Sequence, residues 1–189
     1  IGFPLNINAP GATVQLADDL LGTSTNSSLT FTQGTFDANG SDVTVYKAIT
    51  SGTGTKVITM GSGLWTISGI SNVWDMTQAN TTVNANTANI VLSNTSTSAR
   101  TFAGGSKTYN KLTIGGSTGI STTAITGSNT FSEIDSTKTV AHTIDFESGA
   151  TNAIATWSVT GTAGNIVGVE SVTAGSISTL SIANTITFD

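Results

Sequence analysis

The residues in this sequence that could carry acid–base chemistry are two pairs of carboxylates. Glu133 and Asp135 form one pair, and Asp145 and Glu147 form the other, each with a spacing of two residues. On a β-strand, side chains two positions apart point to the same face, and glycoside hydrolysis uses two carboxylates that flank one bond. The alternative role is solubilising charge on an outer face near turns. We favour that role, because a Cα separation of about 7 Å fits both hydrolytic geometries and selects neither.

Histidine and metal-binding patterns give no stronger signal. The single histidine, His142, lies three residues before Asp145. This spacing puts the two side chains on opposite faces of a strand and argues against a His–Asp relay. Asp18 and Asp19 could bind Ca²⁺, but no Asp-x-Asp-Gly loop accompanies them, so we expect an acidic turn. The chain has no Cys. We predict no catalytic residue, no metal site and no cofactor.

Aromatic side chains could stack on sugar rings where they lie exposed. Trp65 and Ile67 share one face of a predicted strand, so we expect Trp65 in the core. Trp74 and Tyr109 have polar residues or glycine close to them in the sequence. We predict that these two rings are exposed, and they are our candidates for contact with a glycan.

Composition decides which elements must position these residues. The chain of 189 residues contains 37 Thr, 23 Ser and 21 Gly, and only 9% of it is charged, against roughly 25% in an ordinary domain. β-Branched residues favour strands over helices. Short runs with apolar residues at every second position, such as 29–31, 64–67 and 143–146, alternate with Gly, Asn and Ser. The sequence therefore predicts an all-β protein with many short strands and small turns.

Among all-β folds, a β-solenoid similar to a parallel β-helix fits best, with a β-sandwich as the alternative. The turns are small, the composition is uniform, and low charge suits stacked strands because like charges opposite one another repel. With roughly 20 to 30 residues per coil, the chain would form about six to nine coils. We expect residues 1–28 to be a connecting segment and 29–189 to be the solenoid, as part of a longer chain.

A resemblance supports the repeat architecture. Residues 99–116 (ARTFAGGSKTYNKLTIGG) resemble a phrase in Thr/Gly-rich repeat proteins of bacteriophages, especially marine ones. The likeness extends over roughly 29–180 and includes these segments: 29–39, 61–74, 125–131 and 136–143. Such proteins are virion or surface proteins of the tail-fibre or adhesin type. The resemblance implies a structural or host-attachment role and supplies no catalytic motif.

The functional expectation is a non-enzymatic fibre on a virion surface, which provides a rigid β-rod and a polar host-binding face. Two alternatives remain open, a polysaccharide-degrading spike and a capsid-decorating or filament-forming subunit. The expected partners are further copies of the chain, with a trimer favoured, other virion proteins, and a host glycan or protein. Nucleic acid is not expected, because 6 basic residues against 11 acidic ones cannot neutralise phosphates. A membrane span is not expected either, because no apolar run approaches 18 residues.

Overall fold

The protein is described by a computed structural model that covers residues 1–116, 119, 121–184 and 186. These residues form 18 β-strands and no helix, and every pairing between the strands is parallel. The strands stack as a β-solenoid of about 7 turns, as the sequence predicts. A parallel ladder of this kind excludes the alternative of two facing antiparallel sheets.

The strands belong to two sheets. The ten-stranded sheet follows the order β17-β15-β13-β11-β8-β5-β3-β6-β9, with β1 paired to β3. Its strands are β1 (Leu5–Gln15), β3 (Ser28–Asp37), β5 (Lys47–Thr50), β6 (Lys56–Thr59), β8 (Ser71–Asp75), β9 (Thr81–Asn84), β11 (Arg100–Ala103), β13 (Thr122–Thr126), β15 (His142–Phe146) and β17 (Val167–Ser171). The eight-stranded sheet follows the order β18-β16-β14-β12-β10-β7-β4-β2. Its strands are β2 (Leu20–Leu21), β4 (Val43–Val45), β7 (Leu64–Ile67), β10 (Asn89–Leu92), β12 (Thr108–Ile114), β14 (Thr130–Ser136), β16 (Thr151–Ser158) and β18 (Thr179–Ile182).

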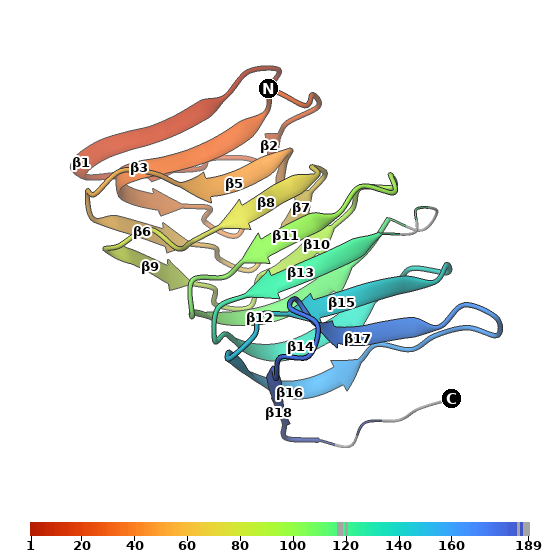
Figure 1. The fold of residues 1–189 in the computed structure, drawn as a ribbon. Helices are drawn as coiled ribbons and strands as arrows, with labels where there is room; N and C mark the ends of the chain where they lie inside the picture. Colours follow the sequence, from red (N-terminus) through yellow and green to blue (C-terminus); the bar gives the residue numbers. More distant parts are fainter. Residues whose placement is uncertain (117–118, 120, 185, 187–189) are drawn as a thin grey trace.

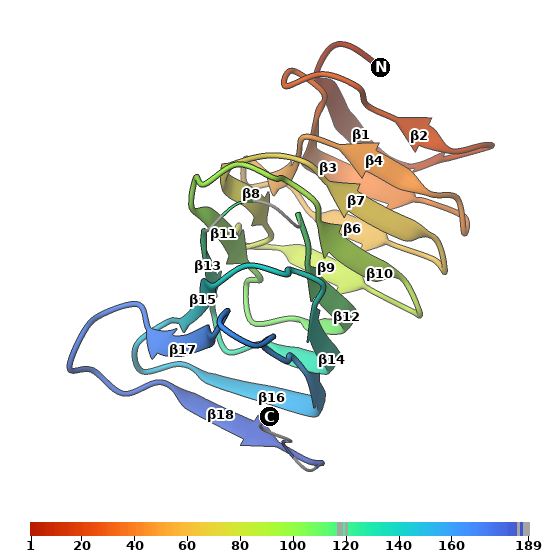
Figure 2. The same cartoon turned by 90° about the vertical axis from the view of Figure 1, so that its right-hand side faces the viewer.

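Most turns of the solenoid place a strand of one sheet and then a strand of the other, whereas the pairs β5–β6 and β8–β9 are consecutive strands of the ten-stranded sheet. The colour sequence follows the stack from red to blue (Figure 1). The view turned by 90° shows the strands of the eight-stranded sheet following one another in the same way (Figure 2). Equivalent positions lie 19 residues apart between Leu29 and Ala48 and 28 residues apart between Trp74 and Phe102. The coil length therefore varies, which is why the sequence repeat is only approximate.

The first turn begins before the boundary that the sequence suggested. Strand β1 pairs in parallel with β3, with Leu5 opposite Leu29 and Val14 opposite Phe36, and β2 pairs with β4. The assignment of 1–28 to a separate connecting segment is thus corrected, because these residues hydrogen-bond and pack as a regular coil. The segment around Asp18 and Asp19 is a turn between β1 and β2. At the other end of the predicted solenoid region, 185 and 187–189 lie outside the described residues.

Inward-facing side chains stack in columns along the solenoid and form one core. One column consists of Val43, Trp65, Ile90, Leu112, Ile134 and Trp157. Aromatic rings also contact one another from turn to turn: Trp74 stacks on Phe102 with centroids 5.6 Å apart, and Phe102 contacts Phe131 at 5.8 Å. Among the exposed large apolar side chains, all but Leu64 lie in the first or last turn. Exposed apolar side chains are therefore concentrated in the first and last turns.

Glycine permits close contact between successive coils. Gly34 has a φ of +93° at the point where β3 changes partner from β5 to β6. A Cβ atom at this position would lie 2.0 Å from the carbonyl oxygen of Ala9 in the preceding coil. Only glycine accommodates both the left-handed backbone and this approach.

Candidate functional site

The first carboxylate pair lies on the outer face of the eight-stranded sheet and is engaged in ion pairs. The Lys111 ammonium lies 3.1 Å from Glu133 Oε1 and 3.0 Å from Asp135 Oδ2. Hydrogen bonds from Ser158 and from Lys111 hold the pKa of the Glu133 carboxyl below its usual value. A general acid for glycoside cleavage needs a raised pKa, so Glu133 is held in the state opposite to that role. In this arrangement both carboxylates lie on an outer face and share one cation.

The second pair, Asp145 and Glu147, does not act as a unit. Glu147 Oε2 accepts a hydrogen bond of 2.6 Å from the Gly127 backbone N–H of the preceding coil. Asp145 lies directly opposite Glu170, because β15 and β17 pair in register. Burial and the adjacent Glu170 carboxylate raise the pKa of Asp145, and its Oδ1 is buried without a hydrogen-bond partner. The carboxylate pair that the fold assembles is therefore Asp145 with Glu170, which only the register between strands reveals.

His142 faces the interior, on the opposite side of β15 from Asp145, so the predicted orientation of the two side chains on opposite faces is confirmed. Its Nδ1 lies 2.8 Å from the Val140 carbonyl oxygen, and its Nε2 lies 2.9 Å from Ser136 Oγ. Because a carbonyl only accepts, Nδ1 carries a proton toward Val140. The Ser136 hydroxyl lies within hydrogen-bond distance of both His142 Nε2 and the Ile114 carbonyl oxygen. This pair resembles a nucleophile with its base, but the ring is only 4% exposed. The contact joins the end of β14 to the start of β15, so it links two successive strands of the coil.

Arg100 lies at the same corner, where the chain passes from the eight-stranded to the ten-stranded sheet. Its side chain is 1% exposed. One terminal nitrogen donates to the carbonyl oxygens of Leu92 (2.9 Å), Gly115 (3.3 Å) and Asn94 (3.4 Å), and the other donates to Ser121 Oγ at 3.2 Å. Burial lowers the pKa of the guanidinium, and its Nε is buried without a partner. Arg100 thus holds the corners of two successive coils together, the β10–β11 connection and the β12–β13 connection.

Lys138 adds a second buried cation to this corner. It is 4% exposed, and its ammonium donates to the Gly116 carbonyl oxygen at 2.8 Å. Burial, followed by the positive charge of Arg100, lowers the pKa of Lys138 to about 8. The pKa of His142 is lowered as well, by burial and by the charges of Lys138 and Arg100, although its hydrogen bond to Val140 opposes the shift. We call Arg100, Lys138 and His142 the basic corner; its composition makes the corner sensitive to pH.

The prediction that Trp74 and Tyr109 are exposed is wrong. Trp74 is 0% and Tyr109 is 1% exposed. Trp74 Nε1 donates to the Tyr109 hydroxyl at 3.2 Å, and that hydroxyl donates to the Gly104 carbonyl oxygen at 2.7 Å. A register shift in β8 turns both Val73 and Trp74 inward, so the polar neighbours do not indicate the side of the sheet on which Trp74 lies. Neither ring presents a face to a sugar, whereas the expected burial of Trp65, at 0% exposed, is confirmed.

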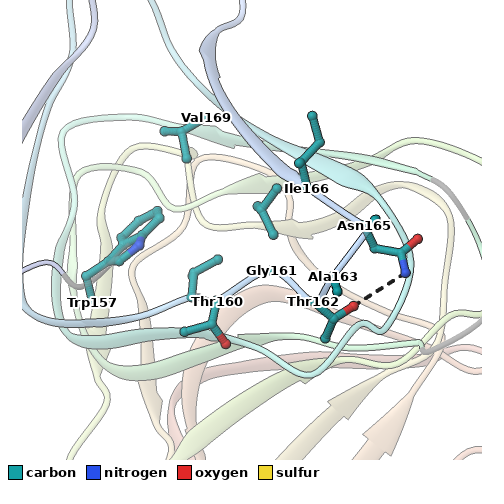
Figure 3. Close-up of a pocket in the computed structure, with 11 residues that line it drawn as sticks. Trp157, Thr160, Gly161, Thr162, Ala163, Asn165, Ile166 and Val169 are labelled. Atoms are coloured by element: carbon teal, nitrogen blue, oxygen red, sulfur yellow. Dashed lines mark hydrogen bonds between the residues drawn. The ribbon is translucent and has the colours of Figure 1, made fainter. Parts of the chain in front are cut away.

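The third tryptophan, Trp157, borders a pocket in the last turn. The pocket has a volume of about 740 Å³ and lies between the end of β16, the connection 159–166 and β17. Trp157 is partly buried and contacts Phe146 with ring centroids 6.4 Å apart. Figure 3 shows its ring at one side of the space, with Thr162 and Asn165 at the other. The residues around Trp157 in the sequence give no sign that it is the one tryptophan that stays partly accessible.

The connection that forms the pocket rim is a small hairpin. Thr162 and Asn165 form an antiparallel bridge, with backbone hydrogen bonds of 3.2 Å and 2.8 Å, and the Asn165 amide donates to Thr162 Oγ1 at 3.4 Å. Gly164, with a φ of +79°, allows the tight reversal. In the preceding coil the corresponding connection is only 137–141. The longer connection and its two glycines are the sequence signal that could have indicated a rim here.

Comparisons with known proteins do not assign a family. No family model matches the chain, and no curated protein or solved structure was found that matches it. Within the described residues, no group of three or more His, Cys, Asp or Glu side chains is placed to hold a metal ion. A membrane-spanning helix is absent from the part of the chain that the structure describes.

Proposed function

We propose that this chain is a rigid, non-enzymatic rod segment of an extracellular fibre, of the virion-fibre or adhesin type, which holds a fixed spacing and displays a polar host-binding surface. The observation that carries the proposal is the uninterrupted parallel ladder, which runs from β1 and β2 to β17 and β18 around one core. With about 7 turns at roughly 4.8 Å per turn, the rod is about 34 Å long.

Side chains on the outer surface reinforce the ladder from coil to coil. Gln15 Nε2 donates to Asp37 Oδ2 at 2.8 Å, and the hydroxyls of Thr122 and Thr143 lie 2.8 Å apart. Each contact joins neighbouring coils at the same register, so bending the rod breaks a backbone bond and a side-chain bond together. Stiffness of this kind suits a spacer that must transmit position or load.

The resemblance of 99–116 to phage fibre and adhesin proteins supports the attachment role and an extracellular location. In the structure this segment contains the whole of β11 and β12, whose inward-facing side chains belong to the core and, through Arg100, to the basic corner. The resembling residues are thus ones that maintain the coil. The resemblance therefore supports a fibre or adhesin type of protein and does not identify its ligand.

A direct test combines shape and mechanics. Electron microscopy of the purified chain should show short rods of constant width, and sedimentation should show whether three copies associate. Unfolding of single molecules by force should give coil-by-coil steps at forces typical of parallel ladders. Compact globular particles that soften without steps would contradict the rod.

Polysaccharide cleavage is the second candidate, and the raised pKa of Asp145 beside Glu170 is the observation that favours it. The test is to incubate the chain with host-surface polysaccharide and to measure new reducing ends. We expect none. Cleavage that Asp145→Asn abolishes and Glu133→Gln leaves intact would replace the rod proposal with an enzymatic one.

A further inference from the structure

Strand β9 leaves a free sheet edge in the middle of the solenoid. It pairs with β6 and, among the described residues, with no other strand, so it ends one branch of the ten-stranded sheet. Figure 1 shows β6 and β9 to the left of β8 and β11. The chain around β9 and the coil that follows it, up to the end of β12, are described throughout. The edge is therefore formed by the coils themselves and lies away from both ends of the chain.

The edge exists because the coil loses one side after β9. Between β8 and β10 the chain forms a third strand, β9, whereas β11 passes to β12 through the short connection 104–107. The two coils touch before β9, where the Met76 N–H donates to the Ala103 carbonyl oxygen at 2.9 Å. They touch again after β9, where the Asn110 amide donates to the Thr87 carbonyl oxygen at 3.0 Å. In the described coil that follows, no strand stacks on the chain between Met76 and Thr87.

Backbone groups along this edge have no partner. The Asn84 carbonyl oxygen accepts a hydrogen bond of 2.9 Å from the Met60 N–H, on the side of β6. Alternate residues of a strand direct their N–H and C=O groups to opposite neighbours, so those of Thr81 and Val83 point away from β6. Within the described residues, no hydrogen bond reaches the N–H or C=O groups of Thr81 and Val83. A strand added beside β9 would satisfy them.

Side chains beside the edge are also incompletely satisfied. Thr81 is 6% exposed, and its Oγ1 has no hydrogen-bond partner in the described part of the chain. Val83 packs against the core but is only partly buried. Thr82 and Asn84 are exposed on the outer face. An added strand would cover Val83 and bring polar groups close to the Thr81 hydroxyl.

Charge and edge protection favour a second copy of this chain as the added strand. Natural sheet edges are protected by charged side chains, proline or bulges. Strand β9 is short, but residues 76–99 contain no charged residue and no proline, and the β6–β9 pairing has no register shift. Two copies of a chain with a net charge of −5 meet with least repulsion at an uncharged segment. A strongly charged partner would find no complementary charge on it.

We propose that two copies pair through β9 in antiparallel orientation, with Thr82 on a two-fold axis. A two-fold interface brings the same residues of both copies together. With Thr82 opposite Thr82 of the second copy, Thr81 lies opposite Val83 of the second copy and exchanges both N–H···O bonds with it. The two rods then lie side by side and run in opposite directions. The inference goes beyond the rod function proposed above, because it concerns how rods associate.

Sedimentation of the full chain from about 10 μM to about 1 mM measures this association. We expect a monomer–dimer equilibrium. Val83→Pro removes an N–H that faces the free edge and leaves the pairing with β6 in place, because proline is tolerated on an edge strand. It should weaken dimerisation by roughly tenfold or more, since each copy loses one hydrogen bond to the other and the proline ring obstructs the approach.

A charge exchange tests the two-fold axis itself. Side chains directly opposite one another are close, so Thr82→Lys places two ammonium groups together and Thr82→Glu places two carboxylates together. Each variant alone should dimerise roughly two- to fivefold more weakly than the parent, and an equimolar mixture should dimerise more tightly than either. Thr130→Lys, at an exposed strand threonine of the eight-stranded sheet, is the matched control and should dimerise as the parent does. Circular dichroism checks that each variant keeps its strands.

Amide hydrogen exchange gives an independent measure of the same contact. The N–H groups of Thr81 and Val83 should exchange quickly in dilute protein and more slowly as dimers form. The N–H of Thr82, which points to β6, should be protected at all concentrations. Protection of Thr81 and Val83 in dilute, monomeric protein would show that the edge is already covered within one chain, and would overturn the interface.

Three results of the sedimentation experiments would also overturn it. The first is a monomer throughout the concentration range. The second is a dimer or larger assembly that Val83→Pro does not weaken, because the contact would then lie elsewhere. The third is a mixture of the two Thr82 variants that dimerises no better than either alone, which would exclude the two-fold axis. Rods seen by electron microscopy in any of these cases would leave the rod function intact, so the two failures are distinguishable.

Discussion

Replacing the buried lysine of the basic corner should change how the stability of the solenoid depends on pH. Lys138 is 4% exposed, and burial together with Arg100 lowers its pKa to about 8 from 10.5. In Lys138→Met the side chain keeps a similar length and loses its charge. The variant therefore removes one titration from the corner, at the cost of the hydrogen bond to the Gly116 carbonyl oxygen.

The sign and size of the effect follow from proton linkage. Between pH 8 and pH 10.5 the unfolded chain binds more protons at Lys138 than the folded chain does. The free energy of unfolding of the parent should therefore rise with pH across this window, relative to the variant. Each pKa unit corresponds to about 1.4 kcal/mol, so the whole window gives at most about 3.5 kcal/mol.

Urea unfolding followed by tryptophan fluorescence at several pH values from 7.5 to 10.5 measures this difference. Lys107→Met, which removes one positive charge outside the corner, is the matched control. The free energy of unfolding of the parent minus that of Lys138→Met should increase with pH. The same difference taken with Lys107→Met should increase less. Parallel plots of unfolding free energy against pH for the parent and Lys138→Met would refute a lowered pKa of Lys138 caused by burial and by the charge of Arg100.

Three further predictions concern other contacts. The pKa of His142 is lowered from 6.5, so the parent should lose stability as the pH falls below about 6.5, and His142→Gln should lose less in acid-unfolding curves. Gly34→Ala should destabilise the chain by more than roughly 1–2 kcal/mol, the cost of placing an alanine in a left-handed conformation, because the new Cβ would also meet the Ala9 carbonyl. Gly149→Ala is the control in thermal unfolding, because Gly149 has a φ of +78° but open space around it. Asp145→Asn should raise the free energy of unfolding at pH 7, measured with urea, by roughly 0.2–1 kcal/mol, because it removes repulsion from Glu170. The gain should shrink as the pH falls toward 3.8, the unperturbed pKa of Asp145. An equal gain at all pH values would contradict the repulsion.

The sequence predicted the general architecture because composition and local alternation act over a few residues. Threonine, isoleucine and valine at every second position favour strands, and glycine-rich turns of a few residues favour stacked coils over a sandwich. The same local patterns predicted the burial of Trp65 and the opposite orientations of His142 and Asp145. They failed for Trp74, because the register shift in β8 places two consecutive residues inward.

The partners and pKa values of the carboxylates depend on contacts between coils that the sequence does not specify. Glu133 and Asp135 are neighbours in the chain, but their state depends on Lys111, which is 22 residues from Glu133 and directly opposite it in the adjacent coil. Asp145 has its raised pKa because Glu170 occupies the matching position one coil later. The approximate repeat does not specify these registers, because coil lengths differ from turn to turn.

By itself, then, the sequence determined that the chain forms short strands with a polar exterior and an apolar interior, since those preferences are local. It favoured parallel stacking and left a β-sandwich as the alternative. The tertiary structure decided which residues meet between coils: the basic corner, the pairing of Asp145 with Glu170, the burial of Trp74 and Tyr109, and the pocket beside Trp157. The physical reason is that stacking brings together residues roughly 20 to 30 positions apart, and a shift of a single residue in that register exchanges an exposed side chain for a buried one.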